Sequence, residues 1–497
     1  MLRILRIIIA TIVMIIITII FLDFTGTIQN FLNLICKIQF IPALLSFNIV
    51  MLIVLFLLSM FLGRIYCSTI CPLGTLQDIM ITLSRNKKKR PFTYYPLSRF
   101  LLFIKYSFLV CFSFSLLVGI SLIIGLLEPF SVYGKIITQL FTPLYLMINN
   151  IFAYFAEKTD SYTFYEVEIW VKSFFILVAT LLYFIFIIFL VWRKGRVYCN
   201  IICPVGTFFG LLKKIIPYGY KLAINIEKCN KCGLCEAQCK SSCINSDLKR
   251  IDEENCVKCF NCISICSRKA LTYSMYLNQK KNLSSMDSTR RKFISKSILL
   301  MIGLFIASKT HAYNYDGGLA PVENKIAPKR KVRITPPGSI SHRHFNRFCT
   351  SCHLCISLCP NKVLRPSLKL TNFMQPEMSF EKGYCRPECV KCSSVCPTNA
   401  IQSITAEEKS GFQIGYAVFS YDRCVINTDN VNCDRCMTKC PTGAITMVEQ
   451  LIQDGKIAKL PVVEIERCIG CGACEQLCPA RPFSAIYVEG MYIHRKI

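Results

Sequence analysis

Four long apolar runs dominate the N-terminal part of the chain, and shorter segments that contain most of the charged residues separate them. The runs cover Ile4–Leu22, Phe47–Leu62, Phe100–Leu127 and Phe174–Trp192. A helix of about 20 apolar residues crosses the roughly 30 Å hydrocarbon core of a bilayer, and only the second run is marginally short. Buried helices of a large soluble core would need flanking polar faces, which these runs lack. The pattern therefore predicts a four-helix membrane unit over residues 1–223.

Lysine and arginine are distributed unevenly between the segments that join these runs. They are frequent at the N-terminus, between the second and third runs, and after the fourth run. By contrast, residues 23–40 contain only Lys37, and residues 128–170 contain only Lys135 and Lys158. Positively charged loops remain in the cytoplasm. The alternation predicts four crossings of an inner (cytoplasmic) membrane, with both ends of the unit in the cytoplasm.

One motif occurs twice, after the second run and after the fourth. Gly63–Thr75 reads GRIYCSTICPLGT and Gly195–Thr207 reads GRVYCNIICPVGT, so nine of thirteen positions are identical. In each copy Cys-x3-Cys places two sulfurs on one side of a helical turn, and the following proline suits the start of a new helix. Duplicated membrane folds form shared sites where their halves meet. We therefore expect the two copies to meet around a pseudo-symmetric site.

The cysteines of this repeat are the candidate redox site of the membrane unit: Cys67, Cys71, Cys199 and Cys203. Together they could bind a further cluster, another metal or a redox disulfide. The alternative is that they are buried structural cysteines. Cys36 and Cys111 lie in or near apolar runs, and we expect them to be packing residues.

Residues 224–275 form a compact module with two four-cysteine groups. Three thiolates at Cys-x2-Cys-x2-Cys spacing reach three irons of a cubane, and the fourth cysteine ligates the other cluster. The predicted ligand sets are Cys229, Cys232, Cys235 and Cys266 for one [4Fe–4S] cluster, and Cys256, Cys259, Cys262 and Cys239 for the other. Lys240 and Ser267 replace the proline that usually follows the fourth cysteine, and Cys243 is interpreted as a bystander. Two zinc sites are the rival interpretation, although zinc motifs seldom contain four cysteines in one run.

Residues 346–497 form a second module with four groups, each ending in Cys-Pro. We expect these sixteen cysteines to hold four clusters; the groups are Cys349, Cys352, Cys355 and Cys359; Cys385, Cys389, Cys392 and Cys396; Cys424, Cys433, Cys436 and Cys440; and Cys468, Cys471, Cys474 and Cys478. The two middle groups depart from strict spacing at their first cysteine, which a loop can supply. By analogy with four-cluster electron-transfer subunits, the outer groups are expected to cross-ligate with each other and the inner groups likewise; sequential pairing is the alternative.

Two further features of this half of the chain have competing interpretations. Cys349-x2-Cys352-His353 fits c-type haem attachment, but haem would leave Cys355 and Cys359 without a role, so we expect no haem. Residues 276–345 are predicted to be a linker. Within it, residues 288–312 place a pair of arginines before a short apolar run, and this resembles an internal twin-arginine export signal. A fifth membrane helix is the alternative, and both place the second module outside the cytoplasm.

The charge balance excludes one common interpretation. The chain has 497 residues and a formal charge of +28. Six oxidised clusters with their thiolates add about −2 each, which leaves about +16. No nucleic-acid-binding fold accompanies the basic segments, so we expect no nucleic-acid partner. All five histidines follow residue 310, which excludes a bis-histidine haem in the membrane unit.

Two protein families resemble successive parts of the chain. Residues 47–273, with two CxxxCP motifs and a dicluster module, resemble the NapH-type family. Residues 288–497, with the twin-arginine-like segment and four cysteine groups, look like NapG and MauM proteins. The resemblance implies an α-helical membrane unit joined to α+β bacterial-ferredoxin-like [4Fe–4S] modules. The two parts are fused here, whereas the family has separate subunits.

The same resemblance implies an electron carrier with quinol dehydrogenase activity in anaerobic respiration. Membrane quinol would supply electrons, and a soluble periplasmic redox partner, a reductase in the family, would receive them. The first module would lie in the cytoplasm, where a cytoplasmic electron donor is a further expected partner. The alternatives are an assembly factor of the CcoG type for a respiratory oxidase, which lacks a four-cluster module, and a redox sensor of the NosR type, whose flavin-binding domain has no counterpart here.

Overall fold

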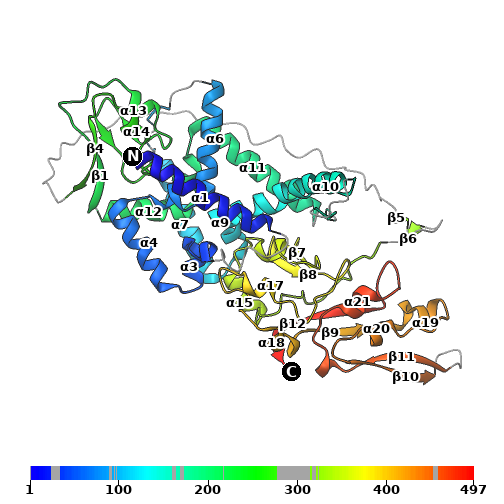
Figure 1. The fold of residues 1–497 in the computed structure, drawn as a ribbon. Helices are drawn as coiled ribbons and strands as arrows, with labels where there is room; N and C mark the ends of the chain where they lie inside the picture. Colours follow the sequence, from blue (N-terminus) through cyan, green and yellow to red (C-terminus); the bar gives the residue numbers. More distant parts are fainter. Residues whose placement is uncertain are drawn as a thin grey trace.

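The structure is a computed structural model that describes residues 2–23, 34–88, 92–94, 96, 98–158, 164–167, 169, 173–216, 218–276, 314–315, 321–322, 324–451 and 457–497. A central helical unit (residues 2–216) carries a cysteine-rich lobe at each end (Figure 1). We call residues 218–276 the first lobe and residues 324–497 the second lobe. The twin-arginine-like segment 288–312 lies outside the described residues, so its role stays a prediction.

Four helical stretches of the central unit are long and apolar enough to cross a membrane, which indicates a multi-pass membrane protein. They are α1 (Leu2–Leu22), α7 (Arg99–Val118), the stretch Pro129–Lys158 and α11 (Phe174–Lys194). The third of these stretches is made of α9 (Pro129–Ile136), the π-helical turn η1 (Ile137–Phe141) and α10 (Thr142–Lys158). The shorter helices of the unit are α3 (Phe40–Leu45), α4 (Ile49–Leu62), α5 (Tyr66–Thr69), α6 (Pro72–Lys88), α8 (Ser121–Leu127), η2 (Tyr198–Ile202) and α12 (Pro204–Ile215).

Two boundaries differ from those predicted. The apolar run over residues 100–127 is divided, because Gly119 adopts a left-handed conformation with φ 86° and ends α7 before α8 begins. Residues 128–170, predicted to be a loop, are helical from Pro129 to Lys158. The Glu128 carboxylate starts that helix by accepting a hydrogen bond from Phe130 N at 3.3 Å. The loop is predicted because these residues lie between two apolar runs, and their few lysines indicate only the side of the membrane.

The marginal second run becomes α4, a helix of 14 residues. Such a helix is about 21 Å long, shorter than a bilayer core. It nevertheless joins the two lobes, because the Phe47 ring at its start lies 6.4 Å from that of Phe348 in the second lobe. At its other end, Leu62 O accepts a hydrogen bond from Tyr273 Oη of the first lobe at 3.4 Å. The helix therefore extends from one lobe to the other.

Other helices run between the lobes in alternating directions. α1 begins at the first lobe, where Arg3 Nη1 donates to Ser264 Oγ at 3.1 Å. α7 also begins there, with Lys105 Nζ 2.5 Å from Glu254 Oε1, and it ends where Gly119 lies against the backbone of the second lobe. α11 ends at the first lobe, where Arg196 N donates to Lys240 O at 2.9 Å.

Each lobe is built from short antiparallel strand pairs and one-turn helices that follow the cysteine motifs. In the first lobe, β1 (Gly219–Ile224) pairs with β4 (Leu271–Tyr276) and β2 (Ile244–Asn245) with β3 (Arg250–Ile251), around α13 (Leu234–Ala237) and α14 (Asn261–Ile265). Such strand pairs are too short to fold alone, so the cysteine-rich core between them must contribute the remaining stability.

The second lobe has two halves, each with its own buried core. The first half contains α15 (His342–Phe348), α16 (Leu354–Ser357), β7 (Leu364–Pro366), η3 (Leu370–Asn372), β8 (Pro376–Met378), α17 (Lys391–Ser394) and α18 (Ala406–Ser410). The second half contains β9 (Phe412–Phe419), η4 (Tyr421–Arg423), α19 (Val425–Thr428), α20 (Arg435–Thr438), β10 (Ile445–Leu451), β11 (Ile457–Val463), η5 (Ile465–Arg467), α21 (Ala473–Leu477) and β12 (Ile486–Lys496). The strands pair as β7 with β8, β9 with β12 and β10 with β11. Another short pair, β5 (Asn314–Tyr315) with β6 (Pro321–Val322), precedes the lobe.

The buried core of the helical unit continues into both lobes. It includes Val257 of the first lobe and Leu354, Leu358 and Val395 of the second, together with the four cysteines of the CxxxCP repeat. Cys259 and Cys352 pack against it from opposite lobes. One apolar core therefore connects cysteines of all three parts.

Candidate metal and redox centres

The first lobe brings its cysteines together in the two predicted sets. Cys229, Cys232, Cys235 and Cys266 line one cavity. Cys262 lies within electrostatic range of Cys256, Cys259 and Cys239. Each fourth cysteine therefore joins the three cysteines of the other group, as the spacing predicts. That these eight cysteines ligate iron stays a prediction.

The second lobe pairs its groups in sequence. Cys359 lines a cavity with the first three cysteines of the next group, Cys385, Cys389 and Cys392. Cys396 is within electrostatic range of Cys349, Cys352 and Cys355. Cys478 likewise lines a cavity with Cys424, Cys433 and Cys436. Cys440 is within electrostatic range of Cys468 and Cys471, and both of these are within range of Cys474.

The expectation that outer groups pair with outer and inner with inner is therefore wrong. The physical reason is that each half of the lobe has its own core. α16 packs against α17 in one half, and α20 packs against α21 in the other. The two halves meet where Cys385 N donates to Cys471 O at 2.9 Å, so one cysteine set of each half lies at the junction.

The backbone around the cysteines fits ligated thiolates. In all four groups with strict spacing, the residues on either side of the second cysteine have positive φ: Lys231 and Gly233, Lys258 and Phe260, Ser351 and His353, and Gly470 and Gly472. A non-glycine residue in this conformation costs about 1 kcal/mol or more, and it persists only where its surroundings require it. Sequence reasoning missed this feature, because lysine, serine and phenylalanine give no sign of it.

Backbone N–H groups also point at the fourth cysteine of five groups. The donors are the fourth or fifth residue after that cysteine, at 3.3–3.4 Å from sulfur: Cys243 N to Cys239, Ala270 N to Cys266, Val363 N to Cys359, Ile401 N to Cys396, and Ala444 N to Cys440. Hydrogen bonds of this kind favour the thiolate and tune the potential of a bound cluster. Among the described residues no three His, Cys, Asp or Glu side chains converge closely enough to hold a single metal ion.

The four CxxxCP cysteines converge in the buried core of the helical unit. Cys203 is within electrostatic range of Cys199, Cys67 and Cys71, and each of the four is about 95% buried. α6 begins at Pro72 and α12 at Pro204, as predicted, and Gly206 N donates to Cys203 Sγ at 3.4 Å. N–H groups at a helix start stabilise a thiolate.

The remaining positions of the repeat hold these cysteines in place. A Cβ on Gly74 would lie 2.2 Å from Cys67 O, and one on Gly206 would lie 2.3 Å from Cys199 O, so neither position admits a side chain. The arginines are exchanged between the copies. Arg64 Nη2 donates to Cys199 O, and the Arg196 Nη1 atom donates to Cys67 O, both at 2.9 Å. Each copy therefore fixes the loop of the other.

The amide nitrogen of Gln77, beside the four thiols, has no hydrogen-bond partner among the described residues. The Gln77 side chain accepts a hydrogen bond from Cys199 Sγ at 3.3 Å, while its Nε2 is buried without a partner among the described residues. A buried unpaired donor is costly, and it is tolerated where a bound group can receive it. The site therefore fits a sulfur-rich centre with acceptor capacity.

Asp78 of α6 joins the helical unit to the first lobe. Its carboxylate lies 2.9 Å from Arg6 Nη1, 2.9 Å from Arg196 Nε and 3.3 Å from Lys240 Nζ. Burial opposes ionisation, but the charges of Arg196 and Lys240 hold the pKa of the Asp78 carboxyl well below its usual range. The absent proline after Cys239 is thus explained, because Lys240 docks the lobe there.

Three cysteines outside the main sets lie in different surroundings. Cys36 is fully buried, which is consistent with a packing role, whereas Cys111 is exposed on α7. Cys243 is not isolated, because its sulfur lies 3.5 Å from that of Cys239 and it also hydrogen-bonds Cys256. Its position beside two predicted ligands of one set was not foreseen from the sequence.

His353 has partners on both ring nitrogens. Nδ1 lies 3.1 Å from Gln139 Nε2 of the helical unit, and Nε2 lies 2.9 Å from Met374 O. A haem at the Cys349-x2-Cys352-His353 motif would need one of these nitrogens as a ligand. Both ring nitrogens are therefore already engaged in this structure, and the absence of haem stays a prediction.

Known proteins match both ends of the chain. Residues 45–91 and 176–219 match the family model described as a 4Fe-4S binding domain, and residues 430–481 match a 4Fe-4S dicluster domain. The ferredoxin-type protein NapG of Escherichia coli is 31% identical over 175 residues, which are 33% of this chain and 75% of NapG. The chain belongs to the ferredoxin-type [4Fe–4S] proteins.

Two further relatives support the same family for this ferredoxin-type protein. NapF of Escherichia coli is 32% identical over 168 residues, 32% of this chain and 87% of NapF. The methylamine utilization ferredoxin-type protein MauM of Methylobacillus flagellatus is 24% identical over 209 residues, 40% of this chain and 84% of MauM. No solved structure matches the chain. The two segments of the 4Fe-4S binding domain each contain one CxxxCP motif, so [4Fe–4S] chemistry is associated with the helical unit as well as with the lobes.

Proposed function

We propose that this protein carries electrons across a membrane, from quinol to a soluble partner on the opposite side from the first lobe. The proposed ligands are the 24 cysteines of the lobes, in six sets of four, with a further redox centre at Cys67, Cys71, Cys199 and Cys203. A bound [4Fe–4S] cluster takes up and releases one electron at a time. The chain's own part is to hold these groups in a fixed series and to exclude water between them.

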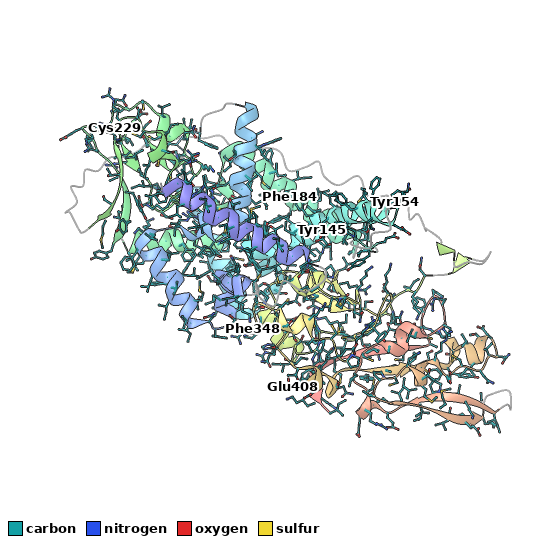
Figure 2. All side chains as sticks on the ribbon, viewed as in Figure 1. Tyr145, Tyr154, Phe184, Cys229, Phe348 and Glu408 are labelled. Atoms are coloured by element: carbon teal, nitrogen blue, oxygen red, sulfur yellow. The ribbon has the colours of Figure 1, made fainter. Side chains whose placement is uncertain are left out.

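The observation that carries the proposal is the continuous order of the cysteine sets. Cys229 lies at the outer side of the first lobe (Figure 2). Cys259 of the other set in that lobe lies within electrostatic range of Asp78, which binds Arg196 next to the CxxxCP cysteines. Beyond them, Cys352 packs on the same buried core, and Cys385 and Cys471 join the halves of the second lobe. These contacts support our proposal that the sets form one path, in which the last is Cys424, Cys433, Cys436 and Cys478.

The arrangement of charge supports an orientation with the first lobe in the cytoplasm. Lys240, Lys105 and Arg196 lie at the end of the helical unit that meets the first lobe. Positive charge collects on the cytoplasmic side of membrane proteins. The second lobe then lies on the other side, where a soluble periplasmic protein is the proposed electron acceptor. Site-directed labelling of exposed lysines in sealed vesicles tests this, and labelling of both lobes from one side would contradict it.

The test of function is reduction by a menaquinol analogue of the anaerobically purified full-length protein. We expect EPR signals of reduced clusters to appear, and their absence would count against quinol as donor. Substitution of Cys67 and Cys199 by serine should abolish this reduction while dithionite still reduces the clusters of both lobes. Iron and sulfide analysis completes the test, because six clusters indicate that the CxxxCP site holds no cubane and seven indicate that it holds one.

A further inference from the structure

The second lobe rests on a hairpin formed by α8 and α9 of the helical unit. A Cβ on Gly125 of α8 would lie 3.3 Å from Thr350 O, and one on Gly134 of α9 would lie 2.5 Å from Cys352 O. Gln139 in the following turn contacts His353. The loop that carries the first two cysteines of the lobe is therefore seated directly on the backbone of the hairpin, with no room for side chains between them.

Lys135 of α9 lies within this contact. Its side chain is 5% exposed, and its Nζ donates to Gly125 O at 2.8 Å. The ammonium is within electrostatic range of Glu128, Cys352 and Cys349. A buried cation is costly unless negative charge lies nearby. Glu128 of the hairpin supplies part of this charge, and four thiolates around a cluster, which belong to the lobe, supply more.

We propose that Lys135 raises the reduction potential of the cluster held by Cys349, Cys352, Cys355 and Cys396. Docking of the second lobe on the hairpin is then required for this cluster to accept electrons at that potential. This inference rests on the proposed function. Reduction adds one negative charge to the cluster, and a nearby cation stabilises that charge and raises the potential. Because Lys135 belongs to the helical unit, the cluster loses this stabilisation whenever the lobe leaves the hairpin.

Arg333 provides a contrast on the other side of the same cysteines. It is also within electrostatic range of Cys349, and its Nη2 donates to Gln375 Oε1 at 2.9 Å. Both residues belong to the second lobe, so Arg333 accompanies the cluster whether or not the lobe is seated. The contributions of Lys135 and of Glu128, which is also within electrostatic range of Cys352, depend on docking.

The test is a redox titration of the full-length protein followed by EPR. The cluster is assigned by the signal that Cys355→Ser alters. In Lys135→Met we expect the potential of this cluster to fall while those of the other clusters stay unchanged. Lys135→Arg keeps the charge and should remain close to the wild type. Lys158→Met is the matched control, because Lys158 lies on the same helical stretch but is exposed at its far end.

The variant Gly134→Ala tests the docking of the second lobe separately from the charge of Lys135. It retains Lys135, but its Cβ displaces Cys352 O and unseats the loop, so the same cluster should again fall in potential. Hydrogen exchange at Thr350 should rise in this variant and stay unchanged in Lys135→Arg. The inference is overturned if Lys135→Met, or Gly134→Ala with raised exchange, leaves the potential unchanged. A second lobe without iron would instead contradict the proposed function.

Discussion

The two lobes share one construction but are attached to the helical unit in different ways. The first lobe is joined by ion pairs, in which Lys240 meets Asp78 and Glu254 meets Lys105. The described contacts of the second lobe are close backbone approaches at Gly125 and Gly134, ring contacts, and an amide–imidazole hydrogen bond. The first lobe also has close backbone approaches, because a Cβ on Gly195 would lie 2.3 Å from Lys240 O and one on Gly210 would lie 2.6 Å from Glu254 O. What distinguishes the first contact is therefore its buried ion pairs.

This difference has a consequence for how each lobe responds to change. A buried ion pair leaves an uncompensated charge when one partner is removed, which costs several kcal/mol. A close-packed backbone contact is insensitive to charge, but a single added methyl group disrupts it. We therefore expect pH and charge substitutions to act mainly on the first lobe, whereas small steric substitutions act on both lobes.

The largest effect is expected for Asp78→Asn. This change leaves Arg6, Arg196 and Lys240 without their shared carboxylate in a buried site. The expected loss is about 3–5 kcal/mol of stability. Hydrogen–deuterium exchange should rise around residues 239–243 of the first lobe and stay unchanged around Thr350. Equal rises at both positions would remove the distinction between the two attachments.

Acid should loosen the first lobe through the same residues. The pKa of Asp78 lies below its usual range. Desolvation raises the pKa of Glu254, but the hydrogen bond from Lys105 outweighs this effect and lowers that pKa to about 2. Because the folded pKa values are lowered, the stabilisation is complete above the unfolded values near pH 4 and is lost as the pH falls toward about 2. Exchange around residues 239–243 in the full-length protein should therefore rise between about pH 4 and pH 2. Asp78→Asn should weaken that dependence, and a rise above pH 5 would contradict it.

Much of this arrangement could be predicted from the sequence because cysteine spacing and hydropathy are local signals. The apolar runs gave α1, α7 and α11, and the spacing rule gave the cysteine sets of the first lobe. The pairing in the second lobe failed, because it depends on which halves share a core. The hairpin of α8 and α9 was also not predicted, because the role of Gly125 and Gly134 depends on the backbone of the second lobe that lies against them.

The exchange of arginines between the two copies of the repeat belongs to the same class of feature. Identical residues at Arg64 and Arg196 indicated two related halves. Only the fold shows that each reaches the carbonyl of the other copy's cysteine. Tertiary contacts of this kind leave no periodicity in the sequence from which to infer them.

A smaller effect is expected for Lys240→Pro, which restores the proline usual after a fourth cysteine. The variant loses the ion pair with Asp78, while Arg6 and Arg196 still compensate the carboxylate. We expect a loss of about 1.5–3 kcal/mol, the range for a hydrogen bond to a charged group. Ser267→Pro is the matched control at the other fourth cysteine. If both variants retain iron and only Lys240→Pro lowers the melting temperature, the lysine serves docking and not cluster binding.

The smallest effect is expected for Cys243→Ala, which concerns a feature that only the first lobe has. All sixteen cysteines of the second lobe belong to the four groups, whereas Cys243 is additional and contacts Cys239 and Cys256. Because a thiol is a weak donor, stability should change by less than about 1 kcal/mol. Both cluster signals of the first lobe should persist. The signal of the cluster assigned to Cys256, Cys259, Cys262 and Cys239 should shift to lower potential, because hydrogen bonds to its sulfurs are lost. Cys243→Ser keeps a hydrogen-bond donor, so the potential of this cluster should lie between the values for the wild type and for Cys243→Ala. Loss of the cluster in Cys243→Ala would instead make Cys243 a ligand, and the first lobe would then differ from the second in ligation as well as in attachment.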